Sequence, residues 1–308
     1  MAFGLKHLFG LKGVSKEDIT TILDTAVSFR EILDRPIRIV PTLKGVAVLN
    51  LFFEDSTRTR MSFELAAKRI SAEVVTFAKS TSSVSKGESF RDTVRNIEAM
   101  KIDLIVVRHS SPGVPQFLAA HTGCRIVNAG DGSHEHPTQA LLDMLTIRQH
   151  FGKLEGLKVL IVGDILHSRV ARSEIYGLRT MGATVDVCGP STMIPLDMST
   201  FDVNVHTGFD DILQEYDVIY MLRIQKERQN SGILPSTREY TSLFGLTKDR
   251  LGRMKPDAVV MHPGPVNRGV EMDYEVADSE RSLILEQVTN GEAVRMAVLF
   301  LLSGGREQ

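Results

Sequence analysis

Residues 46–60 read VAVLNLFFEDSTRTR, and this stretch decides the expected fold. The apolar residues up to Phe53 are typical of a buried strand, and apolar residues at helical spacing follow between positions 63 and 70. The hydroxyls and arginines of 56–60 therefore fall on a first helical turn, where backbone N–H groups lack helical partners and the helix dipole is positive. The stretch predicts a strand, a loop and a helix whose start binds an oxyanion such as phosphate. The same residues are also typical of an ordinary capped helix, so local physics leaves both interpretations open.

The composition predicts two domains and excludes some partners. The chain has 308 residues, of which 43% are hydrophobic, and it exceeds what one core usually holds. Lysine and arginine number 36 against 38 aspartate and glutamate, and the net charge of -2 argues against a nucleic-acid surface or a polybasic membrane anchor. Any cationic site must therefore be local.

The cysteines and the apolar runs indicate the cellular compartment in which the protein is expected. Only two cysteines occur, Cys124 and Cys188, which suits a reducing cytoplasm and excludes a disulfide framework or a cysteine-rich zinc site. Residues 1–14 show no signal-peptide core, and the apolar run 296–302 is far short of the ~20 residues that a membrane span needs. We expect a soluble, cytoplasmic protein with neither nucleic-acid nor membrane partners.

Strand and helix patterns alternate along the chain. Ser15 and an acidic first turn predict a helix that ends near residue 33. The other predicted strands are 73–77, 104–107, 125–128, 158–162, 184–187, 203–206, 218–221 and 258–261, and the other predicted helices are 90–100, 140–149 and 291–302. This alternation predicts an α/β fold with two doubly wound domains, 1–150 and 151–290, each a parallel sheet flanked by helices.

Polar segments of the first domain are candidates for binding. Residues 80–89, STSSVSKGES, are typical of a flexible linker but also of a lid that carries the charge of Lys86. Arg108 follows a strand directly, and α/β sheets bind ligands at that end of their strands. His136 and Gln139 lie three residues apart at a helix start, so they point the same way.

The run His134-Glu135-His136 invites a metal hypothesis. It lacks the i, i+4 spacing of His-Glu-x-x-His, and no third ligand is evident. A capped turn before a helix that begins with proline explains Pro137 well. We therefore expect no metal here.

The second domain offers cations and carbonyls. Arg169 lies just beyond the strand 158–162, but the loop between them lacks G-x-G-x-x-G, which argues against nucleotide binding. Residues 223–228, RIQKER, would by position alone be a solvated loop. In 262–269, HPGPVNRG, two prolines fix backbone carbonyls that can accept from an amino group.

Five segments, in order, resemble motifs of the aspartate and ornithine carbamoyltransferase family. They are Phe-x-Glu-x-Ser-Thr-Arg-Thr-Arg at 52–60, the loop with Ser82 and Lys86, Asp-Gly-x-x-x-His-Pro-Thr-Gln at 131–139, Arg-x-Gln-Lys-Glu-Arg at 223–228 and the 262–269 segment. The resemblance implies a carbamoyl phosphate-binding domain at 1–150, joined by a C-terminal helix at 291–303 that packs back on it, and an aspartate-binding domain at 151–290.

The resemblance also implies a role for individual residues. The implied carbamoyl phosphate ligands are Ser56, Thr57, Arg58, Thr59, Ser82, Lys86, Arg108, His136, Gln139, Pro263 and Gly264, and the implied aspartate ligands are Lys86, Arg169, Arg223 and Gln225. Arg58, Thr59, Lys86, Arg108 and His136 are implied to be catalytic. Glu54 is implied to pair with Arg169 and Arg228 when the domains close.

The implied reaction is carbamoyl transfer to aspartate in pyrimidine biosynthesis, with no cofactor and no metal. The ornithine enzymes of the family carry a cysteine in the His-Pro-Gly-Pro segment and a Ser-Met-Gly loop, and this chain has neither. Ornithine or another amine as acceptor, and a catalytically silent scaffold subunit, are the alternatives. The resemblance implies a homotrimer whose active sites are shared between subunits, with further association with dihydroorotase or a regulatory chain left open.

Overall fold

The computed structural model describes residues 3–54, 56–78, 90–224 and 236–304. The chain forms two compact units, of which the first comprises Met1–Leu145 and Thr289–Gln308 and the second comprises Thr146–Val288. The first unit is therefore discontinuous in sequence, and the second is an insertion between its two parts.

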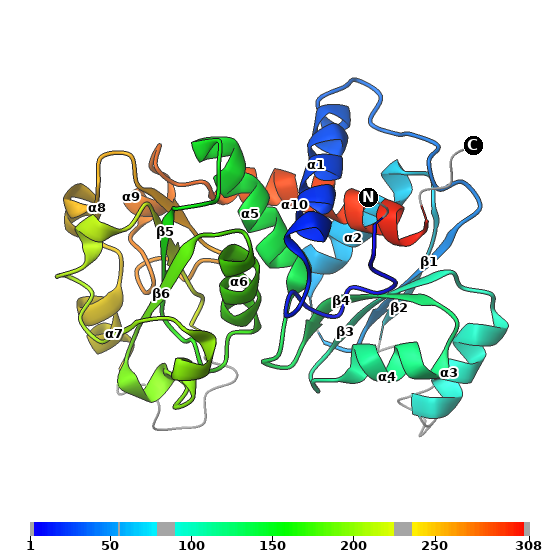
Figure 1. The fold of residues 1–308 in the computed structure, drawn as a ribbon, viewed down its shortest axis with the longest axis horizontal. Helices are drawn as coiled ribbons and strands as arrows, with labels where there is room; N and C mark the ends of the chain where they lie inside the picture. The colour runs from blue at the N-terminus through cyan, green and yellow to red at the C-terminus, as the bar shows by residue number, and fades with distance from the viewer. Residues whose placement is uncertain (1–2, 55, 79–89, 225–235, 305–308) are drawn as a thin grey trace. The chain divides into compact units, whose positions relative to one another are not determined.

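The first unit is built on a parallel sheet with the strand order β2-β1-β3-β4 (Figure 1). Its strands are β1 (Ala47–Phe52), β2 (Glu73–Ala78), β3 (Leu104–His109) and β4 (Arg125–Asp131). Its helices are α1 (Lys16–Leu33), α2 (Thr57–Arg69), α3 (Phe90–Ala99) and α4 (Val114–His121). Leu49 and Leu51 on one face of β1 pack with residues of α3 and α4, while α1 and α2 lie along the other face. Helices therefore cover both faces of this sheet.

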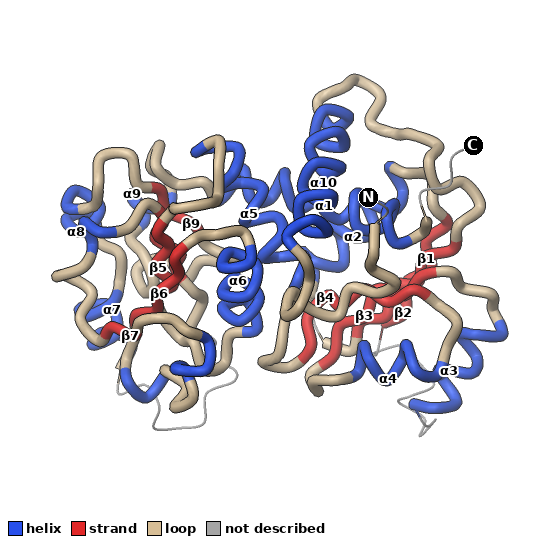
Figure 2. The backbone as a smooth tube through the Cα atoms, viewed as in Figure 1, coloured by secondary structure: helices blue, strands red, loops and turns tan. Residues whose placement is uncertain are grey.

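The second unit contains a parallel sheet with the order β7-β6-β5-β8-β9, drawn in red in Figure 2. Its strands are β5 (Lys158–Val162), β6 (Thr184–Cys188), β7 (Val205–His206), β8 (Val218–Met221) and β9 (Val259–Met261). Its helices are α6 (Arg169–Thr180), α7 (Thr237–Phe244), α8 (Lys248–Arg253) and α9 (Tyr274–Ala277), with short 3-10 turns η3 (Ser191–Met193), η4 (Met198–Phe201) and η5 (Leu213–Glu215). The remaining helices, α5 (Pro137–Phe151) and α10 (Ile284–Leu302), each run from one unit into the other.

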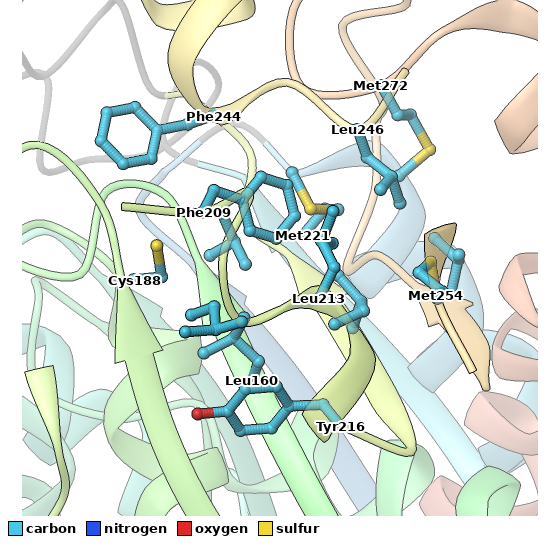
Figure 3. Packing of buried hydrophobic residues seen from close by; sticks show 14 of the residues in the cluster. Leu160, Cys188, Phe209, Leu213, Tyr216, Met221, Phe244, Leu246, Met254 and Met272 are labelled. Atoms are coloured by element: carbon cyan, nitrogen blue, oxygen red, sulfur yellow. The ribbon is translucent and has the colours of Figure 1, made fainter. Parts of the chain in front are cut away.

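The core of the second unit joins one face of its sheet to the helices that follow β8. Leu160 and Met221 from the sheet pack with Phe244 of α7 and with Met254 just after α8 (Figure 3). The hydroxyl of Tyr216 in this cluster donates to Asp186 at 2.7 Å. This apolar packing fixes the strand ends from which the loops of the second unit emerge.

The predicted fold class is confirmed, as two parallel sheets flanked by helices. The C-terminal helix packs on the first unit, where Glu292 forms an ion pair of 2.5 Å with Arg69 of α2. The predicted start of this helix was wrong by seven residues, because α10 begins at Ile284. Its first turns bury polar Gln287 and expose Leu285, so the apolar pattern there does not mark the buried face.

Two further findings concern the cysteines and the helices. Cys124 and Cys188 are buried and free. Among the helices that the structure describes, none has the length and apolar character to cross a membrane.

Candidate functional site

In the first sheet, the strand order reverses direction between β1 and β3. The chain leaves β1 towards β2 on one side and returns to β3 on the other, so the loops after β1 and β3 diverge. Ligands of open α/β sheets bind at such a switch point, outside the carboxyl ends of the strands. The loop after β1 leads into α2, and β3 ends with Arg108 and His109.

The start of α2 is suited to an anion. Its N-cap Ser56 makes no capping hydrogen bond with its side chain, and its first turn contains no acidic residue. In α1, by contrast, Ser15 accepts from the Asp18 N–H at 3.0 Å and two acidic residues occupy the first turn. The positive end of the α2 dipole is therefore not offset by a carboxylate of its own first turn. Thr57 and Arg58 are exposed there, so they can reach a bound phosphate.

Arg108 is held at the end of β3 by two acceptors. Its Nε donates to Glu54 Oε2 at 3.2 Å, and its Nη1 donates to the Ala129 carbonyl at 3.4 Å. Both side chains of the Arg108–Glu54 pair are mostly buried, with 15% and 17% of their surface exposed. Glu54 therefore has a partner within its own unit, and its predicted pairing with Arg169 and Arg228 on closure stays a prediction.

The segment between β4 and α5 is organised by Asp131. This buried carboxylate accepts from the Gly113 N–H at 2.9 Å and from Asn128 Nδ2 at 2.7 Å, and His134 Nδ1 lies 3.2 Å away. Burial raises the pKa of the Asp131 carboxyl, but these hydrogen bonds outweigh it and hold the pKa below its usual value. The segment that ends in His136 is thus fixed by an ionised carboxylate.

Glu135 has a structural role. Its carboxylate accepts from the backbone N–H groups of Leu11 at 2.6 Å and Lys12 at 3.3 Å, and so ties the N-terminal segment to the site. Gly10 allows this approach, because a Cβ there would lie 2.2 Å from Glu135 Oε1. Within the described ranges, no group of three or more histidine, cysteine or acidic residues is arranged to hold a metal ion.

His136 and Gln139 both lie at the start of α5 and are buried. The Gln139 Nε2 group donates to the two carboxylate oxygens of Asp143, one turn further along, at 3.2 and 3.1 Å. Asp143 has no exposed surface, and the sequence analysis did not identify it. The predicted carbamoyl ligand Gln139 is therefore oriented by a neighbour on its own helix.

The second sheet has an equivalent switch point between β5 and β8. After β5, buried Asp164 accepts from the His167 N–H at 3.2 Å and contacts His167 Nδ1 at 2.9 Å. Ser168 then caps α6 by accepting from the Ala171 N–H at 3.1 Å. These contacts place the predicted aspartate ligand Arg169 at the first position of α6, where it is buried.

Arg223 follows β8, and its segment is tied to the Pro263 turn by Glu271. The Glu271 carboxylate has no exposed surface and accepts from the Ile224 N–H at 2.8 Å and from the Asn267 N–H at 2.7 Å. Burial raises the pKa of Glu271, although the same hydrogen bonds act in the opposite direction. In the turn itself, the Gly264 N–H donates to His262 Nδ1 at 2.8 Å, and Gly264 adopts a φ of 64° that a residue with a Cβ rarely adopts.

The structure thus places the predicted residues of each unit at the ends of its strands. Ser56, Thr57, Arg58, Thr59, Arg108, His136 and Gln139 lie in the first unit, and Arg169, Arg223, Pro263 and Gly264 lie in the second. Ser82, Lys86, Gln225 and Arg228 lie outside the described residues.

Comparison with protein families matches both parts of the chain. Residues 6–149 match the carbamoyl-P binding domain of aspartate/ornithine carbamoyltransferase, and residues 155–302 match the Asp/Orn binding domain of the same enzymes. The chain belongs to the aspartate/ornithine carbamoyltransferase family. Each of the two matched domains contains one of the two switch points.

Relatives in this family match over the full length. The aspartate carbamoyltransferase catalytic subunit of Syntrophotalea carbinolica is 56% identical over 307 residues, which cover 100% of this chain and 98% of that protein. The corresponding subunit of Heliobacterium modesticaldum is 54% identical over 305 residues, which cover 99% of this chain and 98% of that one.

Solved carbamoyltransferase structures share the fold. Aspartate transcarbamoylase from Trypanosoma cruzi, in complex with carbamoyl phosphate and aspartate, matches with a TM-score of 0.86 at 30% identity and covers 97% of both chains. The catalytic subunit of M. jannaschii aspartate transcarbamoylase matches with a TM-score of 0.83 at 36% identity, covering 96% of this chain and 97% of that one.

Proposed function

We propose that this chain transfers the carbamoyl group of carbamoyl phosphate to the α-amine of L-aspartate, giving N-carbamoyl-L-aspartate and phosphate. This is the committed step of pyrimidine biosynthesis. The observation that carries the proposal is that arginines lie at or just after strand ends around the switch point of each sheet, Arg58 and Arg108 in one unit and Arg169 and Arg223 in the other. Both substrates are anions, and each unit offers cations for one of them.

The reaction is a substitution at a carbonyl carbon. The deprotonated amine forms a C–N bond, the carbonyl oxygen gains negative charge, and the C–O bond to phosphate then breaks with its electron pair leaving on phosphate. The amine nitrogen loses a proton as the product forms, and the departing phosphate accepts it. The step requires no covalent enzyme intermediate, so the protein contributes positioning and charge stabilisation.

In the first unit, we assign the phosphate to the start of α2. Ser56, Thr57 and Thr59 supply hydroxyls there, and the exposed Arg58 stabilises charge on the departing phosphate. Arg108 and His136, with Thr59, stabilise the developing oxyanion. Gln139 accepts from the carbamoyl nitrogen.

In the second unit, we assign the two aspartate carboxylates to Arg169 and Arg223. Glu271 supports this assignment, because it fixes the backbone of the residue next to Arg223. The carbonyls of the turn at Pro263 and Gly264 are assigned to the amino groups of the substrates. Ser82, Lys86 and Gln225 complete the site by resemblance to the family, and Glu54 with Arg169 and Arg228 is proposed to stabilise the closed form.

We also propose that the chain acts as a homotrimer in the cytoplasm. Support for assembly comes from apolar side chains on α2 and the edge strand β2, where Met61, Leu65 and Val75 are exposed by 53%, 43% and 47%. The two free, buried cysteines support a reducing compartment. Association with dihydroorotase or with a regulatory chain stays a prediction from the resemblance.

The test is product formation by the purified chain, with carbamoyl phosphate as donor and either L-aspartate or L-ornithine as acceptor. We expect turnover with aspartate alone. Turnover with ornithine would overturn the assignment of Arg169 and Arg223 while leaving the phosphate site intact. No turnover with either acceptor would contradict the enzymatic function and favour a scaffold role.

A further inference from the structure

The amide of Gln139 has a defined orientation. Its Nε2 group faces both carboxylate oxygens of Asp143, at 3.2 and 3.1 Å. An ionised carboxylate only accepts hydrogen bonds, so an inverted amide would set acceptor against acceptor. The NH₂ group of Gln139 is therefore committed to Asp143, and its carbonyl oxygen is turned the other way as an acceptor.

A buried cation interacts electrostatically with Asp143. Arg295 of α10 is buried, and burial lowers the pKa of its guanidinium to about 10 against the opposing charges of Asp143 and Glu292. Arg295 therefore remains protonated at neutral pH, and its positive charge lies within electrostatic reach of the Asp143 side chain. The charge at position 143 is thus matched within the same unit.

Arg295 also connects Asp143 to the phosphate end of the site. Its Nη1 donates to Ser62 Oγ in α2 at 2.8 Å, and its guanidinium lies 5.2 Å from the centroid of the Phe63 ring. Gly291 leaves room for this guanidinium, since a Cβ there would lie 2.6 Å from Arg295 Nη1. One buried group of charges thereby contacts both helices whose first turns carry the predicted donor ligands.

We propose that Asp143 is a positioning residue that makes Gln139 an acceptor for the carbamoyl NH₂ group, and so selects carbamoyl phosphate over acyl phosphates without that group. This inference rests on the proposed function. Acetyl phosphate is the matched probe, because a methyl group replaces the NH₂ and cannot donate to Gln139. A site built to hydrogen-bond a substrate group disfavours an analogue that lacks it, since its own polar atom is then left without a partner.

The experiment compares dissociation constants of carbamoyl phosphate, acetyl phosphate and inorganic phosphate for the wild-type chain and for Asp143→Asn. An asparagine can donate as well as accept, so it no longer imposes one orientation on Gln139. We expect carbamoyl phosphate to bind about tenfold more weakly, while acetyl phosphate and phosphate stay within about twofold. An equal loss for all three ligands, or no change for any, would overturn the proposal.

A double-mutant cycle with Gln139→Ala separates positioning from general structure. If Asp143 acts through Gln139, Asp143→Asn changes the ratio of carbamoyl to acetyl phosphate affinity in the wild-type background and leaves it unchanged in Gln139→Ala. Additive effects of the two substitutions on this ratio would contradict the inference.

Two further variants control for folding. Glu292→Gln removes a negative charge that acts on Arg295 and that pairs with Arg69. We expect it to lower stability without changing the ratio of carbamoyl to acetyl phosphate affinity. Asp143→Asn leaves Arg295 buried with less opposing charge, and this could prevent folding. In that case the double variant Asp143→Asn/Arg295→Met removes both charges, and we expect it to show the ratio of carbamoyl to acetyl phosphate affinity that is expected for Asp143→Asn. A wild-type chain that binds carbamoyl phosphate no more tightly than acetyl phosphate would contradict the proposed function itself.

Discussion

Glu271 accepts a hydrogen bond from the backbone N–H of Ile224 at 2.8 Å, and this bond joins the segment of Arg223 to the turn after β9. The same carboxylate accepts from Asn267 through both its backbone N–H and its side-chain Nδ2, each at 2.7 Å. Three donors thus converge on one buried carboxyl group, 47 residues along the chain from Ile224. The position of the Arg223 backbone consequently depends on an acidic side chain that does not itself belong to the proposed ligand set.

Glu271→Gln tests this dependence. Glutamine keeps the size but turns an NH₂ group towards donors, and a buried donor left without an acceptor costs about 1–3 kcal/mol. We expect the KM for aspartate to rise about tenfold and the KM for carbamoyl phosphate to stay within about twofold, as measured by steady-state kinetics. Glu275→Gln is the matched control, because Glu275 is exposed four residues further on. Equal rises in both KM values would indicate a general loss of structure instead.

Arg58→Ala tests the role of the α2 start in catalysis. We expect kcat to fall about 10³-fold with a much smaller change in KM, because charge on the departing phosphate is greatest in the transition state. Lys68→Ala removes one positive charge from the last turn of the same helix and should leave kcat near wild type. An unchanged kcat in Arg58→Ala would refute the assigned role.

Mixing of two inactive variants tests whether active sites are shared. Arg58→Ala and Lys86→Ala chains are each expected to be inactive. If each site takes Arg58 from one chain and Lys86 from its neighbour, dissociation and random reassembly restores roughly a quarter of the sites. Activity that stays at zero after verified subunit exchange would show that both residues serve a site within one chain.

Asp131→Asn tests the buried carboxylate ahead of His136. The folded-state pKa of Asp131 lies below the ordinary value of 3.8, so its ionised form stabilises the fold above that pH, and the contribution is lost as pH falls through the folded pKa. Urea unfolding at pH 7 should show the variant less stable by about 1–2 kcal/mol, the difference between charged and neutral hydrogen-bond acceptors. The difference in unfolding free energy between the wild type and Asp131→Asn should become smaller as the pH is lowered below 3.8. A difference in unfolding free energy that does not change with pH would contradict this account.

Strand ends were predictable, and buried charges were not. The hydroxyls of α2 directly follow the apolar run of β1, and Arg108 directly follows the apolar run of β3, so these local patterns predicted both the elements and an anion site. Asp143 and Glu271 carry no such pattern, because each reads as an ordinary acidic residue on or near a helix. What distinguishes these two residues is that their side chains are buried, and only the folded chain shows which carboxylates are removed from water.

The helix α4 was also not predicted from the sequence. α4 begins after Gly113, which has a φ of 85°, and carries Pro115 in its first turn, so its pattern reads as a loop. For residues 134–136, the sequence favoured a structural turn over a metal site. The structure shows a role for Glu135 that local spacing could not predict, because its carboxylate accepts from the distant backbone N–H groups of Leu11 and Lys12.

The discontinuous first unit has a consequence for synthesis on the ribosome. Asp143 emerges with the first part of the chain, but Arg295 follows only after the whole second unit has been translated. At typical elongation rates, roughly 8 to 30 seconds separate the two residues. During that interval the nascent chain holds Asp143 of α5 without the buried guanidinium of Arg295, so the charge group of the first unit is completed only after the second unit has been synthesised. A stop codon just after Val288 would therefore release chains with a complete second unit and an unfinished first one.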